Sequence, residues 1–99
     1  MNEVKLIGRL TKDINLRFLP KTGVAVGNFT IAVNEGYGEV KKAYFFNCEI
    51  WGNKAIALAE NKGKGDKILV NGKLKQVFYD KNEKKCSKIF VQVGDVNFM

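Results

Sequence analysis

The stretch from Ala43 to Gly52 constrains the fold most, because it has large apolar side chains at both odd and even positions. Side chains alternate between the two faces of a β-strand. One face of this strand would carry an ordinary core set, consisting of Tyr44, Phe46, Cys48 and Ile50. The other face would carry Phe45, Asn47, Glu49 and Trp51. Two large rings among polar groups suit neither a buried layer nor a purely hydrated one, so the second face is predicted to be a binding surface.

Length and composition predict one soluble domain, residues 1–99, with one compact core. A chain of 99 residues buries only about 60 to 65% of its unfolded surface, which is too little for two cores. Its 45% hydrophobic and 27% charged residues are typical of soluble globular proteins. No apolar run approaches the ~18 residues that span a bilayer. Charges interrupt the apolar residues of Met1–Arg9, unlike those of a signal peptide. We therefore expect no membrane partner and a cytoplasmic location.

The residue types needed for most catalytic and metal sites are missing or scattered. The chain has no histidine, and Cys48 and Cys86 lie far apart in sequence, so the usual zinc sites and cysteine–histidine pairs are not available. Cys48 is predicted to be a small buried apolar residue. A reducing cytosol disfavours, without eliminating, a disulfide between the two cysteines. The ten acidic residues show no spacing that forces two carboxylates together. We expect no enzyme activity, no cofactor and no metal.

Positive charge is concentrated in the second half of the chain. The formal net charge is +7, and the segment from Lys54 to Lys88 holds ten lysines and four acids. A solvated surface is one interpretation of such a segment. Alternation within Gly72–Tyr79 favours another, because it places Lys73, Lys75 and Tyr79 on one face. Lysines beside aromatic rings are typical of surfaces on which bases stack while the lysines hold phosphates.

The segment Glu35–Lys42 is predicted to be a flexible loop with one aromatic residue. Tyr37 lies between Gly36 and Gly38, and a loop tip of this kind offers no packing reason for an exposed ring. The alternative is that the Tyr37 ring folds back onto its own loop.

Five strands and one helix are predicted in total. The strands are residues 3–10, 24–34, the aromatic stretch 43–52, 67–79 and 86–93. Gly8 is expected to mark strong coiling or a bulge, and the strand 67–79 is long enough to serve two sheets if it coils at Gly72. The segment Leu16–Leu19 leads into a turn at Pro20–Gly23. On the second strand Ala25, Gly27, Phe29, Ile31 and Val33 share one face, and on the fifth Ile89, Val91 and Val93 form the core face.

The helix is predicted over residues 53–62, with Asn53 as its N-cap and Gly63 just after its end. Ala55, Ile56 and Ala59 form an apolar stripe that would close one end of a barrel. The order of elements predicts an all-β protein with the OB-fold. This fold is a five-stranded, partly open Greek-key barrel, here with one short helix between strands 3 and 4.

Several segments, in order along nearly the whole chain, are similar to one known family. They are Asn2–Asp13, Leu16–Phe18, Ala25–Asn34, Trp51–Gly52, Lys62–Asp66 and Val70–Leu74. Together they resemble the bacterial single-stranded DNA-binding proteins. The resemblance implies an oligomeric OB-fold, usually a homotetramer, that wraps single-stranded DNA without reading its sequence.

The resemblance also implies which residues bind DNA. The stacking rings of the family correspond to Tyr37, Phe45, Trp51 and Tyr79. The family often has tryptophan at the positions of Tyr37, Phe45 and Tyr79, where this chain has smaller or less electron-rich rings, so weaker binding is expected. The candidates for phosphate contacts are Arg9, Lys12, Arg17, Lys54, Lys62, Lys73 and Lys75. Phe18 and Phe90 would either stack with a base or cover a subunit interface.

The expected mechanism is electrostatic capture followed by stacking. Lysines displace counterions from the strand, and the rings then hold successive bases by their π-faces, which every base has. The expected function is sequence-independent binding of single-stranded DNA, which protects it in replication, recombination and repair. The chain would act as a homo-oligomer, a tetramer or a dimer, because Val26, Phe90 and Phe98 have no obvious internal partner.

The alternative function is that of a protein-interaction adaptor. An OB-fold adaptor in a replication or primosome assembly would bind oligo-dT poorly in moderate salt.

Members of the family typically continue past the barrel into a flexible tail with an acidic tip that recruits other proteins, whereas this sequence stops at Asn97–Met99. The sequence is either a piece of a longer protein or a short form, such as one from a phage or mobile element, and by itself it gives no basis for recruitment of replication partners through such a tail.

Overall fold

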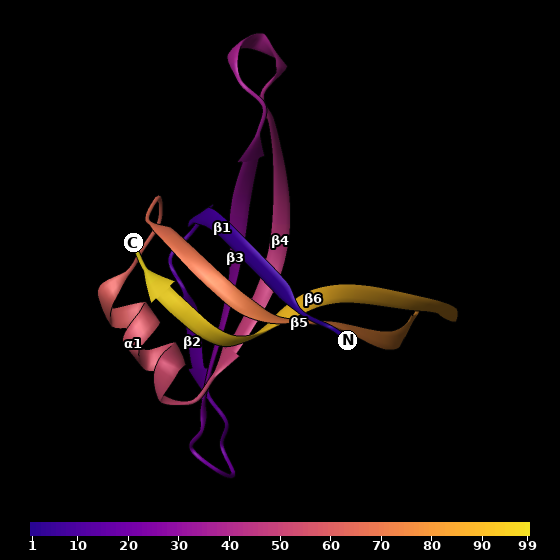
Figure 1. The fold of residues 1–99 in the computed structure, drawn as a ribbon. Helices are drawn as coiled ribbons and strands as arrows, with labels where there is room; N and C mark the ends of the chain where they lie inside the picture. Colours follow the sequence, from indigo (N-terminus) through magenta and orange to yellow (C-terminus); the bar gives the residue numbers. More distant parts are fainter.

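The alternating segments form six strands, and one short helix lies against one side of the sheet (Figure 1). The structure, a computed structural model, describes residues 1–99. The elements in chain order are β1 (Val4–Leu10), β2 (Asn15–Phe18), β3 (Ala25–Glu35), the 3-10 helix η1 (Gly38–Val40), β4 (Lys42–Trp51), α1 (Asn53–Asn61), β5 (Lys67–Lys81) and β6 (Lys84–Phe98). No helix is both long enough and apolar enough to span a membrane.

Five of the strands close into a ring. Neighbouring strands pair in the order β1, β5, β6, β4 and β3, and β1 pairs back with β3 through Arg9 with Ala32 and Leu10 with Ile31. Within the ring, the β4–β6 pairing is parallel and the others are antiparallel. The OB-fold prediction is confirmed, with α1 between the third and fourth strands of the ring. One correction concerns β2, which we did not predict as a strand. It pairs with β3 outside the ring, as a sixth strand of the sheet.

Two glycines permit the close strand contacts of the barrel. A Cβ atom at Gly8 would lie 2.6 Å from the Ala32 carbonyl oxygen, beside the pairing of β1 with β3 that closes the ring. A Cβ atom at Gly72 would lie 2.1 Å from the Gln92 carbonyl oxygen, where the pairing of β5 with β6 shifts register. At Gly8 the register of β1 with β5 continues without a shift, so this glycine is explained by close backbone approach and not by a bulge. At Gly72, where coiling was predicted, the structure has a register shift.

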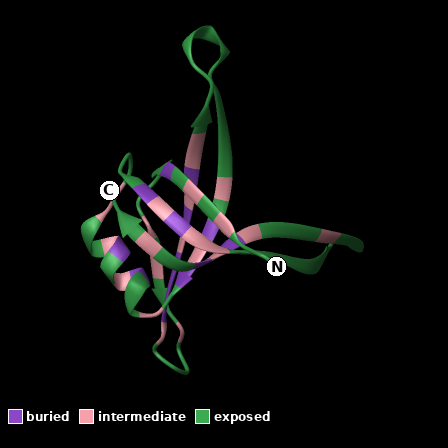
Figure 2. Cartoon of the chain, in the orientation of Figure 1, coloured by how far each residue is buried: buried purple, intermediate pink, exposed green.

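The buried core fills the barrel beneath α1 (Figure 2). Gly27 of β3 makes room for the helix, because a Cβ there would meet Ile50 at 3.2 Å and Ala55 at 3.4 Å. Ala55 is buried as predicted, but the fully buried Leu58 was not in the predicted stripe. The N-cap prediction was also wrong. The helix starts at Asn53 and its N-cap is Gly52, whose φ of 78° belongs to the left-handed region that glycine tolerates.

Two hairpins extend beyond the barrel, where they are exposed on both faces (Figures 1 and 2). We call them the β3–β4 arm (residues 33–44), which has η1 at its tip, and the β5–β6 arm (residues 73–90). The β5–β6 arm is longer than predicted, because only Asn82 and Glu83, both with positive φ, connect its strands. The prediction that Ile89 faces the core was wrong. Ile89 is 59% exposed because it lies on the part of β6 that has left the barrel wall.

Candidate nucleic-acid interface

The two faces of β4 divide as their composition predicted. Cys48 and Ile50 are buried in the core and Phe46 is half-buried, whereas Phe45 is 66% exposed and Trp51 is 45% exposed. Tyr44, expected on the core face, is exposed; it pairs with Val33, which lies beyond the pairing of β3 with β1. The rings of Phe45 and Trp51 therefore stand on the outward face of the barrel and are accessible to a ligand.

Each outward ring of β4 lies two strands away from an arginine. In register across the sheet, Phe45 is opposite Ala32, which is opposite Arg9. Trp51 is opposite Val26, which is opposite Arg17. Partners in register point to the same face of a sheet, so both ring–arginine pairs share the outward face. Both arginines are exposed. The fold thus brings together four residues that sequence reasoning selected from three separate segments.

Val26 corrects one expectation about self-association. It was predicted to be an apolar residue without an internal partner, but its exposed fraction is 0%. It lies in register between Arg17 of β2 and Trp51 of β4, so a strand flanks it on either side. Val26 is consequently buried within the chain and is not available to a second subunit.

The middle of this outward face is polar. The Thr30 hydroxyl donates to Asn47 Oδ1 over 2.8 Å, and the Trp51 indole N–H donates to Glu49 Oε1 over 2.6 Å. Glu49 is in register with Asn28 of β3 and with Gln92 of β6. Amide, hydroxyl and carboxylate groups therefore connect the two aromatic ends.

The surface continues from the barrel onto the β5–β6 arm. Gln92 is opposite Lys73, and the next outward pairs are Lys75 with Phe90, Val77 with Lys88 and Tyr79 with Cys86. Lys73, Lys75 and Tyr79 therefore share a face, as alternation predicted. Lys88 joins them on this face although it was not among the predicted contacts. Its place on the outward side of residues 86–93 was the signal that pointed to it.

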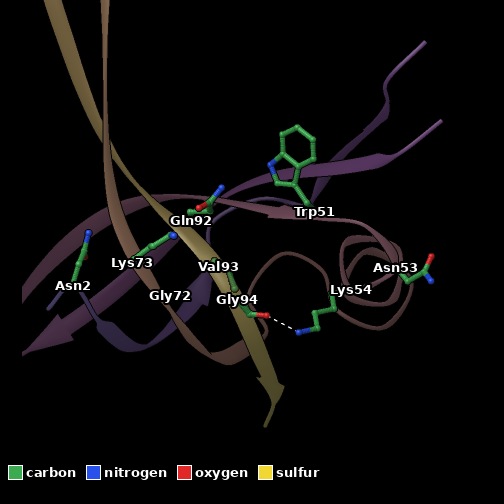
Figure 3. A pocket seen from close by; sticks show the side chains of 9 residues that line it. All are labelled: Asn2, Trp51, Asn53, Lys54, Gly72, Lys73, Gln92, Val93 and Gly94. Carbon is green, nitrogen blue, oxygen red and sulfur yellow. Dashed lines mark hydrogen bonds between the residues drawn. The ribbon is translucent and has the colours of Figure 1, made fainter. Parts of the chain in front are cut away.

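A pocket beside Trp51 gathers three of the predicted residues (Figure 3). Trp51, Lys54 and Lys73 line it together with Gln92 and other residues, namely Asn2, Asn53, Gly72, Val93 and Gly94. The Lys54 ammonium group is already paired, since its Nζ donates to the Gly94 carbonyl over 2.7 Å and to Asp95 Oδ1 over 2.9 Å. A phosphate that reached Lys54 would share or replace these partners.

A second hollow brings in Lys12. It lies between the segment that connects β1 to β2, the outward face of β3 and β4, and the β5–β6 arm. Its lining residues include Lys12, Thr30, Asn47, Lys88 and Phe90. Phe90 is half-buried here. Lys12 and Phe90 thus lie at one hollow, although 78 positions separate them in the sequence.

The remaining candidates lie apart from these hollows. Tyr37 is 84% exposed beside η1 at the tip of the β3–β4 arm, so its ring does not fold back onto its loop. Tyr79 is 45% exposed near the tip of the β5–β6 arm. Lys62 lies against the C-terminal residues, with Nζ 5.8 Å from the centre of the Phe98 ring and 3.2 Å from the Met99 carbonyl oxygen. The structure does not bring Lys62 to the Trp51 pocket.

The two cysteines are both free thiols, so the open question of a disulfide is answered by the geometry. Burial raises the pKa of Cys48 from 9.0 to about 12, because a thiolate would lose its hydration in the core. No three cysteine or acidic side chains gather in an arrangement that could hold a metal ion.

Comparison with known proteins points to one family. The model described as "Single-strand binding protein family" matches residues 1–99. A single-stranded DNA-binding protein of Halalkalibacterium halodurans is 42% identical over 95 residues, which cover 92% of this chain and 54% of that protein. Single-stranded DNA-binding protein 2 of Listeria monocytogenes is also 42% identical over 95 residues, which cover 92% of this chain and 57% of that protein.

A third relative agrees with these two. A single-stranded DNA-binding protein of Bacillus cereus is 44% identical over 89 residues, covering 86% of this chain and 51% of that protein. The chain thus spans little more than half the length of the relatives it matches. Because the family match extends from the first residue to the last, on a barrel of the expected topology, this chain belongs to the single-strand binding protein family.

Proposed function

We propose that this chain binds single-stranded DNA without sequence preference. The observation that carries the proposal is the pairing of an exposed ring with an arginine at both ends of one sheet face, Phe45 with Arg9 and Trp51 with Arg17. A ring stacks on the π-face of any base, and a guanidinium group binds a phosphate of any nucleotide. Neither contact reads the base edge, so binding tolerates every sequence.

The path of the strand is proposed to follow the outward face. It would run past Trp51 and Lys73, along the β5–β6 arm by Lys75 and Tyr79, and would reach Phe45 on the barrel and Tyr37 on the β3–β4 arm. Arg9, Lys12, Arg17, Lys54 and Lys62 are the other proposed phosphate contacts. Lys73 and Lys75 share a strand face with the ring of Tyr79, which supports this direction. Stacking needs unpaired bases, so duplex DNA is not a substrate for these rings.

We also propose that the chain is a homo-oligomer, a dimer or a tetramer. Family membership supports this, and so do exposed apolar side chains on the β5–β6 arm, where Leu74 is 46%, Phe78 is 77% and Ile89 is 59% exposed. Exposed apolar clusters mark interaction surfaces. Sedimentation should give a species larger than one chain at micromolar concentration. A monomer under those conditions would refute the proposal.

The proposed setting is a bacterial cytoplasm, at the nucleoid. There, replication, recombination and repair expose single-stranded DNA, and a protein that covers it without sequence preference protects it. The sequences named as relatives come from bacteria.

The test of the proposed function is a comparison of single strand with duplex. Trp51 is the only tryptophan, so its fluorescence reports on the outward face directly. Titration with oligo-dT in moderate salt should quench this fluorescence, because a base stacks on the indole. Duplex of equal length should produce much weaker binding. Equal affinity for the two ligands would refute the proposal.

The same titration distinguishes the alternative of a protein-interaction adaptor. An adaptor of the OB-fold class would leave Trp51 fluorescence almost unchanged at micromolar oligo-dT in moderate salt. That result would favour a protein partner as the main ligand of this surface.

A further inference from the structure

We propose that Glu49 is a positioning residue, which holds the Trp51 indole in the orientation that stacks with a base. This inference rests on the proposed binding of single-stranded DNA. The two residues are two positions apart on β4 and share its outward face. The indole N–H donates to Glu49 Oε1 over 2.6 Å, a short bond typical of an ionised acceptor. In Figure 3 the Trp51 ring stands off the strand, with its nitrogen on the side toward Gln92, the partner of Glu49 in register.

Glu49 has no ion-pair partner on the outward face. The chain's two salt bridges are Lys5 with Glu3 and Lys54 with Asp95. The cross-strand partners of Glu49, Asn28 and Gln92, are neutral. Lys12 and Lys88 line the same hollow as Glu49, but neither ammonium group lies within ion-pair distance of its carboxylate. A carboxylate without a counter-ion repels phosphates, so its charge opposes the proposed binding. The compensating contribution of the carboxylate is that it accepts a hydrogen bond from the Trp51 indole N–H.

Trp51 needs such a restraint because its packing is incomplete. The side chain is 45% exposed, so a large part of the ring faces solvent. An indole that is free to rotate must be ordered when a base stacks on it, and immobilising a side chain reduces affinity. A hydrogen bond already present in the free protein removes this penalty. Glu49 therefore acts on the DNA through Trp51 and not by contact with it.

The test compares two variants that both remove the charge. Glu49→Gln keeps a side-chain oxygen that accepts the indole N–H, whereas Glu49→Val keeps the strand preference but has no acceptor. Because neither variant is charged, their difference isolates the hydrogen bond. We expect Glu49→Gln to bind labelled oligo-dT about 3- to 10-fold more tightly than Glu49→Val, the size typical of ordering one side chain. Equal affinities of the two variants would overturn the proposal.

A second readout works without DNA and separates this inference from the proposed function. In the free protein, the fluorescence anisotropy of Trp51 should show a fast local motion in Glu49→Val that is absent from the wild type and from Glu49→Gln. If oligo-dT does not bind the wild type, the proposed function fails, yet the anisotropy still decides whether Glu49 orders the ring. Identical anisotropy decays in all three proteins would overturn the role of Glu49.

A third comparison excludes a merely structural role. In a Trp51→Phe background the ring has no N–H to donate, so the affinity difference between Glu49→Gln and Glu49→Val should disappear. If the difference persists there, Glu49 acts on the fold or on the DNA and not through Trp51. Glu60→Ala, which removes an exposed acid of α1, is the control for net charge. Its anisotropy decay should match that of the wild type.

Discussion

Neighbouring residues on β4 have different roles, one in the core and the other on the outward face. Ile50 is 1% exposed and belongs to the core, while Trp51 beside it is 45% exposed and turned outward. The pleat of the strand alone produces this division, since successive side chains point to opposite faces. For this reason the sequence was sufficient to assign both faces of β4. It was not sufficient to predict the contacts between side chains on the outward face, such as the bond from Trp51 to Glu49, because these depend on rotamers.

Cys48 gives a prediction at the scale of one residue. The thiol titrates at 9.0 when exposed, and burial raises its pKa to about 12. Above pH 9 the unfolded chain loses this proton while the folded chain keeps it. The free energy of unfolding should therefore fall as the pH rises from 9 toward 12, by about 1.4 kcal/mol per pH unit from this group. Below pH 9 the contribution is fully present.

The measurement for Cys48 is urea denaturation at about pH 8 and about pH 10, on the wild type and on Cys48→Ala. Lysines and tyrosines titrate in both proteins, so the difference in pH dependence belongs to Cys48. We expect the wild type to lose about 1.4 kcal/mol more than Cys48→Ala over this interval. Equal losses would show that the Cys48 thiol is not desolvated in the fold.

At the scale of elements, strand positions were predicted well and their ends were not. The five barrel strands and α1 follow from hydrophobic alternation and from the alanine-rich segment. β2 was missed because it has four residues, too few for alternation to be recognised. The length of the β5–β6 arm was missed because Asn82 and Glu83 are not a typical hairpin turn pair, in which glycine usually supplies the positive φ. The N-cap was missed because Asn53 is a good cap residue in general, whereas here Gly52 ends β4 with a positive φ.

Gly8 gives a prediction about the closure of the barrel. In Gly8→Ala the new Cβ would lie 2.6 Å from the Ala32 carbonyl oxygen, and this backbone group cannot move without disturbing the pairing of β1 with β3. We expect the free energy of unfolding to fall by about 1 to 3 kcal/mol, as in other overpacked sites. Urea denaturation measures this.

Gly94→Ala is the matched control for Gly8→Ala. A Cβ at Gly94 would meet only the Asn71 carbonyl oxygen, at the ordinary distance of 3.6 Å. The change should therefore alter the free energy of unfolding by no more than about 0.5 kcal/mol. Similar losses in the two variants would mean that close approach at Gly8 is not what closes the ring.

At the scale of the whole molecule, charge and shape act together. The net charge is +7, and basic side chains lie along both the barrel and the β5–β6 arm. The excess of lysine was visible in the sequence, but its arrangement required the fold. Residues as distant in sequence as Arg17 and Trp51 come to the same region of one sheet face only through the pairing of β2, β3 and β4. Lys54 was predicted from the sequence to contact phosphate, but the fold gives it an ion pair with Asp95, which the spacing of the two residues in the sequence did not predict.

The arm lysines give a prediction about salt dependence. Each phosphate contact releases counterions from a single strand, so the logarithm of affinity falls with the logarithm of salt concentration at a slope of about −0.7 per contact. Replacing both Lys73 and Lys75 with alanine should make this slope shallower by about 1.4. Lys21→Ala, in the turn between β2 and β3, should leave the slope unchanged. A wild-type affinity independent of salt would mean that the charge has no part in binding.

The central claim is that the outward face binds DNA while the inward face maintains the fold. The most direct test measures the affinity for labelled oligo-dT and the stability of the same variants of β4. Trp51→Ala should weaken binding by about 1 to 3 kcal/mol with little change in melting temperature, and Phe45→Ala should behave similarly. Ile50→Ala should lower the free energy of unfolding by about 2 to 5 kcal/mol, with affinity unchanged in the folded protein. If Trp51→Ala unfolded the chain while Ile50→Ala weakened binding by a folded protein, the two faces would be assigned the wrong way round.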